Sequence, residues 1–288
     1  MLYALLRYFT KMSKRNKSSS SSKYQLSVIV PAYNETENID PLTERLFKAC
    51  SENNIQLDLL IMDDESEGSE ASIAKVNALK LKHKDSEHTV RIHCRKRVDG
   101  RGLASAVVLG FEKAKYETLC CMDADLQHEP EAVPKVAQPV LTGRSEFSVG
   151  SRFTDGGEIG KNWPLHRRLI SWGATMLAVP LASTTDPMSG FFCLTKELFE
   201  KGRPTLQVSG FKISLELMAR CKPNKIIDVG ISFKERVAGE SKLTLKQNIE
   251  YLQQLATLYI ANMLWLVILM IIIVLAALYY FATFFGLI

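Results

Sequence analysis

The chain has 288 residues, of which 36 are Lys or Arg and 31 are Asp or Glu, so its formal net charge at pH 7 is +5. This length allows one large domain or two small ones. The excess of positive charge is small and scattered, which argues against a nucleic-acid partner and fits only a mild attraction to an anionic membrane surface.

The N-terminal residues are expected to lie outside the folded domain. Residues 1–9 are apolar but too short to span a bilayer, and they fit either an amphipathic surface segment or a disordered one. Residues 11–23 are basic and rich in serine, without apolar periodicity, which is typical of a flexible arm. We therefore assign residues 1–23 to an N-terminal arm and residues 24–245 to one folded domain.

From residue 24 onward, apolar runs typical of buried strands alternate with helical periodicity. The predicted strands are 26–33, 57–64, 90–94, 118–122, 147–152, 189–194 and 226–233. The predicted helices are 41–50, 71–82, 103–114, 131–141, 163–180 and 210–221. This alternation predicts an α/β fold with a mostly parallel sheet flanked by helices on both faces.

Six cysteines occur, and none forms a Cys-x-x-Cys pair. Cys120 and Cys121 are neighbours in a predicted strand, where successive side chains face opposite sides. We expect no disulfide framework, which favours a reducing compartment.

Acidic residues follow three of the predicted strands. Glu35 follows the first strand, Asp63 and Asp64 end the second, and Asp123 and Asp125 follow the fourth. Ligands of open α/β sheets bind beyond the carboxyl ends of the strands. The sequence therefore places a candidate site at this edge.

The Asp123-Ala124-Asp125 sequence has two interpretations. It is either a turn at the end of a strand, where Asp is common, or a site for Mg²⁺ or Mn²⁺, which prefer carboxylate oxygens and substrate phosphates. In an extended chain, Gln127 would add a third oxygen on the same face. The ligand expected at a metal site of this kind is a nucleoside diphosphate.

Seven motifs, in a fixed order, resemble one enzyme family. They are "SVIVPAYNETENI", "LLIMDDESEGS", "MDADLQHEP", "GSRF", "DPMSGFF", "GFKISLEL" and "RVAGESKL". Together they resemble the dolichyl-phosphate mannosyltransferases, which are inverting family 2 glycosyltransferases with the GT-A fold, a Rossmann-like fold of nucleotide-diphospho-sugar transferases. The similarity covers about residues 24–250.

The resemblance implies a donor site with a metal. The donor-binding residues it implies are Pro31, Tyr33, Glu35, Met62, Asp64, Asp123, Ala124, Asp125, Arg152, Arg236 and Lys242. The implied metal ligands are Asp123, Asp125 and Gln127, for Mg²⁺ or Mn²⁺.

The resemblance also implies an acceptor-phosphate site formed by Arg152, Arg167 and Ser171, and a catalytic role for Asp125, Arg152 and Arg167. Arginines at such positions are otherwise ordinary surface residues, and Arg236 and Lys242 also suit the basic flank of a membrane span. Asp186 either orients the acceptor or caps a turn. His128 is interpreted as structural.

The implied reaction is the transfer of mannose from GDP-mannose to dolichyl phosphate with inversion. A lipid phosphate with a second pKa near 6 is mostly dianionic at neutral pH, so it can attack without a general base. Two alternatives remain: a glucosyltransferase that uses UDP-glucose, and a non-catalytic nucleotide-binding membrane subunit.

The C-terminal tail is interpreted as a membrane anchor. All charged residues lie at or before Glu250. We predict an interfacial amphipathic helix at 246–262 and one transmembrane helix at 263–285. Lys242 and Lys246 precede this span and no Lys or Arg follows it, which predicts a cytosolic catalytic domain. The resemblance implies the endoplasmic reticulum membrane and an enzyme that works without accessory subunits.

Overall fold

The computed structural model describes residues 23–96, 102–159, 165–208, 212–233 and 245–284. The principal strands are β1 (Tyr24–Ala32), β2 (Ile55–Asp63), β3 (Thr89–Cys94), β4 (Thr118–Cys121), β5 (Phe147–Ser151), β7 (Phe192–Thr195) and β8 (Ile226–Gly230). They form one seven-stranded sheet in the order β3-β2-β1-β4-β7-β5-β8.

The sheet is parallel except at β7, which runs antiparallel to both of its neighbours, β4 and β5. The carboxyl ends of β1, β2 and β4 therefore meet at one edge, as expected for parallel strands. The predicted strand 226–233 instead divides at Ile231 into β8 and β9 (Ser232–Phe233). β9 pairs with β6 (Glu158–Ile159) in a separate two-stranded sheet.

Helices cover both faces of the large sheet. The α-helices are α2 (Ile39–Glu52), α3 (Ser69–Lys82), α4 (Leu103–Glu112), α5 (Val133–Leu141), α6 (Leu165–Ala178), α7 (Lys196–Gly202), α8 (Ile213–Cys221), α9 (Leu245–Asn262) and α10 (Leu264–Phe284). The 3₁₀ helices are η1 (Thr36–Asn38), η3 (Pro130–Ala132), η4 (Val179–Leu181) and η5 (Arg203–Thr205). Of the α-helices of the folded domain, α7 was not predicted.

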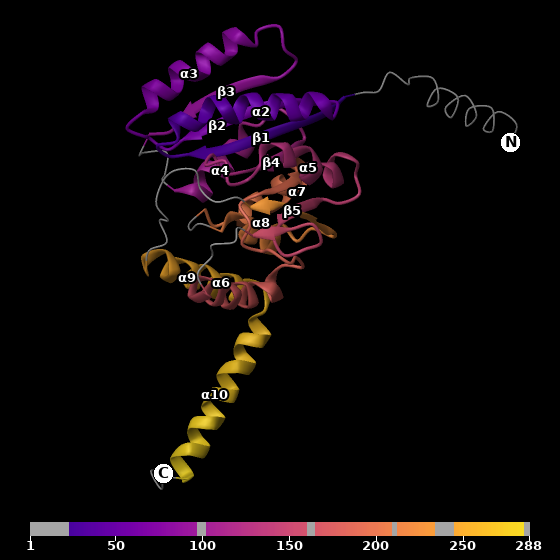
Figure 1. Ribbon diagram of the computed structural model, residues 1–288. Helices are drawn as coiled ribbons and strands as arrows, with labels where there is room; N and C mark the ends of the chain where they lie inside the picture. Colours follow the sequence, from indigo (N-terminus) through magenta and orange to yellow (C-terminus); the bar gives the residue numbers. More distant parts are fainter. Residues whose placement is uncertain (1–22, 97–101, 160–164, 209–211, 234–244, 285–288) are drawn as a thin grey trace, which may run out of the picture.

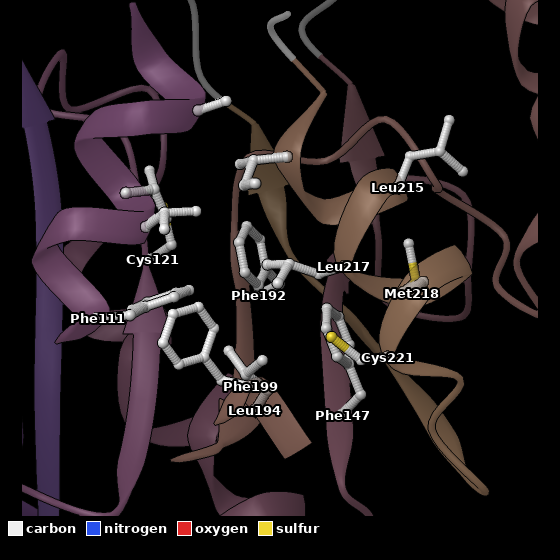
Figure 2. Close-up of a cluster of buried hydrophobic side chains, with 14 of the residues drawn as sticks. Phe111, Cys121, Phe147, Phe192, Leu194, Phe199, Leu215, Leu217, Met218 and Cys221 are labelled. Carbon is white, nitrogen blue, oxygen red and sulfur yellow. The ribbon is translucent and has the colours of Figure 1, made fainter. Parts of the chain in front are cut away.

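Two apolar clusters lie on opposite sides of the sheet. One packs α2, α3 and α5 against β1 and β2, and it includes Cys120. The other packs α4, α7 and α8 against the opposite face, and it includes Cys121. Figure 2 shows Phe111 of α4, Phe192 of β7 and Leu217 of α8 in this second cluster. The alternation of Cys120 and Cys121 is thus confirmed, and all six cysteines are free.

One face of the helix α9 packs against the folded domain. Leu255 and Leu258 are buried in the second cluster. The Tyr251 hydroxyl donates to the Ala174 carbonyl of α6 at 2.7 Å. α6 and α9 therefore lie side by side at the end of the domain from which α10 departs (Figure 1).

Among the described residues, α10 is the one helix long and apolar enough to cross a membrane. Its Leu264–Phe281 window has a mean hydropathy of 2.8, and no part of the window is buried. Its 21 residues would extend about 30 Å, the thickness of a hydrocarbon core. The bounds of α10 agree closely with the predicted span.

Candidate active site

The residues that follow β2 are fixed by a buried arginine. Asp64 accepts hydrogen bonds from Arg95 Nη2 at 2.6 Å and from the Gly102 backbone N–H at 3.0 Å. Arg95 is fully buried and also donates to Ser105 Oγ at 2.8 Å. This buried pair joins the end of β2 to the start of α4. The family resemblance implies that Asp64 binds the donor, whereas no sequence motif pointed to Arg95.

The other predicted nucleoside residues lie at the ends of β1 and β2. Tyr33 is 48% exposed, and Glu35 accepts a hydrogen bond from Asn38 Nδ2 at 2.7 Å. Pro31 is half-buried in β1 and pairs with Met62 of β2. The Met62 side chain is fully buried in the core beside Gly110. Only the main chain of Met62 is therefore available to a ligand.

The Asp123-Ala124-Asp125 segment forms a turn and does not extend β4. β4 ends at Cys121, and Leu126 adopts a left-handed conformation with φ 59°. The Asp125 carboxylate accepts a hydrogen bond from the Gln127 backbone N–H at 3.1 Å, as Asp side chains commonly do in turns. The expected extended, alternating arrangement of Asp123, Asp125 and Gln127 is therefore wrong, although all three lie on one short turn.

His128 lies beneath this turn. It is buried, and its Nδ1 is 3.5 Å from Asp123 Oδ2. Its ring packs against Phe191 and Phe233, with centroids 5.2 and 5.3 Å apart. Burial lowers the pKa of His128, against the opposing charges of Asp123 and Asp125. Asp123 thus contacts His128, whose packing fits the structural interpretation.

The turn has the donor set of a hard divalent cation. Within the described residues no three His, Cys, Asp or Glu side chains form a closed metal cluster. Two carboxylates and one amide would leave positions for substrate phosphates, which Mg²⁺ and Mn²⁺ sites commonly do. A Cβ at Gly190 would lie 3.1 Å from Asp123 Oδ2, so glycine leaves room for this carboxylate. The residues present fit such an ion.

Arg152 follows β5 and is paired with Asp186. Arg152 Nε and Nη2 donate to the two Asp186 oxygens at 2.7 and 2.9 Å. Asp186 is fully buried, and the guanidinium carbon lies 5.3 Å from the ring centres of both Phe153 and Phe233. Within the described part of the chain, Nη1 of Arg152 has no acceptor. Asp186 is therefore the counter-ion of Arg152, a role that neither interpretation of its sequence predicted.

The remaining predicted residues are only partly described. The backbone of α6 carries Arg167 and Ser171 one turn apart, which places them on the same side of the helix, but their side chains lie outside the described part. Arg236 and Lys242 lie outside the described residues altogether. Their roles remain predictions.

The chain is similar to known proteins of one family. Residues 27–203 match the model of glycosyl transferase family 2. The chain is 44% identical to a dolichol-phosphate mannosyltransferase of Mycosarcoma maydis, over 86% of this chain and 85% of that protein. It is 45% identical to a dolichol-phosphate mannosyltransferase of Saccharomyces cerevisiae, over 82% of this chain and 87% of that protein.

A solved structure shares the fold. Glucosyl-3-phosphoglycerate synthase from Mycobacterium tuberculosis, in complex with Mn²⁺, UDP-glucose and glycerol 3-phosphate, has a TM-score of 0.51. It is 17% identical, over 83% of this chain and 80% of that chain. The fold and the family match are thus those of a glycosyltransferase. This chain belongs to glycosyl transferase family 2 and, within it, to the dolichol-phosphate mannosyltransferases.

Proposed function

We propose that this protein transfers mannose from GDP-mannose to dolichyl phosphate and inverts the anomeric carbon. The observation that carries the proposal is the 44–45% identity to dolichol-phosphate mannosyltransferases over most of the chain. The geometry of the site supports glycosyl transfer to a phosphate but does not by itself select the sugar.

On the donor side, Asp123, Asp125 and Gln127 would hold Mg²⁺ or Mn²⁺ together with the diphosphate. The ion would neutralise the negative charge that develops on the departing nucleoside diphosphate. Pro31, Tyr33, Glu35, the Met62 main chain and Asp64 would bind the nucleoside. Arg236 and Lys242 would add positive charge to the diphosphate.

On the acceptor side, Arg152, Arg167 and Ser171 would orient the lipid phosphate. Its oxygen forms the new bond to C1 of mannose while the bond from C1 to the diphosphate oxygen breaks, and the electron pair leaves with GDP. Because the phosphate is already a dianion near neutral pH, no proton has to be removed. The protein then contributes alignment and charge stabilisation. Asp186 fixes Arg152 in one orientation for this purpose.

The surface beside α10 supports a membrane position for the site. Exposed apolar side chains gather on α6, η4 and α9, and they are Trp172, Met176, Leu177, Val179, Ile249, Leu252 and Ile260. Both helices lie where α10 leaves the domain (Figure 1). We infer that this surface lies on the membrane that α10 spans, with the lipid acceptor in the same plane.

The orientation proposed is a cytosolic catalytic domain in the endoplasmic reticulum membrane. Lys242 and Lys246 precede the span, and no Lys or Arg follows it. Protease added outside sealed microsomes should digest the catalytic domain and spare a tag placed after Ile288. A protected catalytic domain would refute the orientation.

The reaction is tested with the full-length protein in detergent, dolichyl phosphate, Mg²⁺ or Mn²⁺, and labelled GDP-mannose or UDP-glucose. Formation of a labelled lipid from GDP-mannose supports the proposal. Transfer from UDP-glucose alone would make the protein a glucosyltransferase. Nucleotide binding without transfer from either donor would make it a non-catalytic subunit.

A further inference from the structure

The segment that precedes α8 connects the active site with α9. Lys212 is the N-cap residue of α8, and its carbonyl accepts the Glu216 backbone N–H at 3.2 Å. The same carbonyl accepts a second hydrogen bond, from Gln254 Nε2 of α9, also at 3.2 Å. The main chain at Lys212 is thus held from both helices.

Gln254 and Glu216 form a buried polar contact between the two helices. Glu216 is fully buried, and its Oε2 accepts a hydrogen bond from Gln254 Nε2 at 3.2 Å. Its Oε1 accepts from the Gln207 backbone N–H at 2.9 Å and from Arg220 Nε at 3.1 Å. A buried carboxylate needs such donors because leaving one unpaired is strongly destabilising. Gln254 is therefore placed to hold the start of α8 by specific bonds.

The start of α8 is also joined to the loop that carries Asp186. Ser214 Oγ donates to the Pro187 carbonyl at 3.2 Å. Asp186 in turn binds Arg152, and Gly190 of the same loop lies against Asp123. A continuous series of contacts thus leads from Gln254 on α9 to the candidate phosphate-binding arginine and the candidate metal ligand.

Lys212 lies two residues before Ser214, which contacts the Asp186 loop, and its side chain interacts electrostatically with the charges of the site. Burial lowers the pKa of Lys212, and Arg152 acts in the same direction, while the carboxylates of Asp123 and Asp186 oppose them. Within the described residues, the Lys212 amine has no ion-pair or hydrogen-bond partner. A partly buried amine that interacts with the charge of Arg152 and has no partner among the described residues is suited to a phosphate oxygen, because hydrogen bonds to charged groups strengthen on burial.

We propose that Lys212 is a further phosphate-binding residue of the active site and that Gln254 is the positioning residue that holds it in place from α9. This inference rests on the proposed transfer from a nucleotide sugar to a lipid phosphate. The phosphate belongs either to the donor diphosphate or to the acceptor. α9 then has a second role, because it completes the site as well as lying beside the anchor.

The test uses four single variants and one double variant of the full-length protein, and the concentrations of both substrates are varied. Lys212→Met removes the charge at similar length, and Lys212→Arg keeps it. Gln254→Leu removes the bridging amide, and Gln253→Leu is the matched control, because Gln253 is the exposed neighbour on the same helix. Losing one charge-assisted hydrogen bond predicts a fall of roughly 10- to 100-fold in kcat/KM for Lys212→Met. Lys212→Arg should recover most of this loss, and Gln253→Leu should behave as the wild type.

The substrate whose KM rises in Lys212→Met is the one whose phosphate Lys212 binds. A higher KM for GDP-mannose, with weaker GDP binding by calorimetry, assigns Lys212 to the donor, and a higher KM for dolichyl phosphate assigns it to the acceptor. Gln254→Leu should change the same constant, to a smaller extent. In the Lys212→Met background, Gln254→Leu should cause little further rise in this KM, because both substitutions remove the same interaction with the phosphate.

Several results would overturn the inference. Full activity of Lys212→Met excludes the binding role. A folding defect is unexpected, because the amine has no partner among the described residues. Gln254 does not act through Lys212 if Gln254→Leu has the same kinetic constants as Gln253→Leu. The same holds if Gln254→Leu lowers turnover equally in the wild-type and Lys212→Met backgrounds. If Gln254→Leu does not fold, Gln254→Asn, which keeps the amide but shortens its reach, is measured instead. An inactive wild type overturns the proposed function, whereas an active wild type with an active Lys212→Met overturns this inference alone.

Discussion

The two halves of the molecule hold their polar site residues in different ways. In the first half, the acidic residues at the end of β2 are satisfied by the elements that follow β2. Asp63 accepts the Ser66 N–H at 3.1 Å and the hydroxyls of Ser66 and Ser69, and Asp64 is bound by Arg95 and Gly102. The bonds from Ser66 and Ser69 lie within one turn of chain, whereas those from Arg95 and Gly102 join the end of β2 to the end of β3 and the start of α4.

In the second half, the corresponding contacts join distant segments. Arg152 binds Asp186, Gln254 binds the Lys212 carbonyl, and Tyr251 binds the Ala174 carbonyl, across 34, 42 and 77 residues of chain. This half also has the contiguous exposed apolar surface of α6 and α9, whereas the first half exposes isolated residues such as Leu81. The first half therefore combines bonds within one turn with bonds between neighbouring elements, whereas the three second-half contacts all join segments more than 30 residues apart.

The largest effect is expected at the turn after β4. Asp125→Asn should lower turnover about 1,000-fold, because it removes half of the carboxylate charge proposed to hold the ion that stabilises the leaving group. Turnover is measured against Mg²⁺ and Mn²⁺ concentration and in excess chelator. Glu131→Gln is the control, since Glu131 is a nearby acid whose exposed side chain pairs with Arg45. Normal turnover of folded Asp125→Asn, or of the wild type in chelator, would contradict the metal site.

The next effect separates the catalytic role of Arg152 from its structural one. Arg152→Ala leaves the fully buried Asp186 without its partner, and such a change costs about 3–5 kcal/mol of stability. The double variant Arg152→Ala with Asp186→Asn removes both charges, and it should regain much of that stability. Its turnover should still be roughly 100-fold lower, because the charge proposed to bind the phosphate remains absent.

Urea unfolding and turnover are measured on both variants, with Arg144→Ala as a control at an exposed arginine. If the double variant is stable and also fully active, Arg152 has no role in the reaction. If the double variant is as unstable as the single one, the pair is not the source of the instability.

The difference between the halves also explains what the sequence could predict. The alternating strands and helices follow from local periodicity, so the predicted strands and helices occur near their predicted positions. The antiparallel direction of β7 and the division at Ile231 depend on which distant strand is available for pairing, and local pattern does not contain that information.

The same limit applies to the site. The edge that gathers Asp64, Asp123 and Asp125 was predicted because carboxyl ends of parallel strands meet. Asp186 and Gln254 were not given their observed roles, since each acts on a partner far away in sequence. One feature of the sequence pointed to Gln254: it is a polar residue directly before Leu255 on a predicted amphipathic helix. No feature of the sequence predicted the left-handed conformation of Leu126, because this conformation is uncommon outside glycine.

A smaller effect is expected at the apolar surface of the second half. A chain ending at Asn262 loses α10, whose spanning window has no buried residues, and should still bind lipid vesicles reversibly through α6 and α9. Trp172→Ser with Leu252→Ser should weaken this binding on the order of 10-fold or more, because two large side chains no longer enter the interface. Flotation with vesicles measures it. Leu81→Ser, at a residue 75% exposed on α3, should not change vesicle binding. An equal loss of binding in this variant would show that binding is not confined to α6 and α9.

The smallest effect on turnover is expected deep in the first half, at the pair of Asp58 and Arg91. Asp58 is fully buried and accepts from Arg91 Nε and Nη2 at 2.8 and 2.7 Å. Burial raises the pKa of Asp58, but the hydrogen bonds and charge of Arg91 outweigh it and hold that pKa below its ordinary value. A carboxyl whose pKa is lower when folded stabilises the protein above its unfolded pKa of about 3.9, and this contribution is lost as the pH falls through the folded pKa.

Arg91→Met removes the group that keeps this pKa low. The variant should therefore begin acid unfolding at a higher pH than the wild type, and at pH 7 it should lose about 1–3 kcal/mol of stability, since a buried carboxylate loses a charged donor. Turnover at pH 7 and at 25 °C should stay within about twofold of the wild type, because Asp58 pairs with Ser27 in the interior of the sheet and contacts no residue proposed for the site. Circular dichroism between pH 7 and pH 2 follows the unfolding. A variant that unfolds at the same pH as the wild type shows that Arg91 does not hold the Asp58 charge, whereas a large loss of turnover in a folded variant shows that the first half transmits strain to its strand ends.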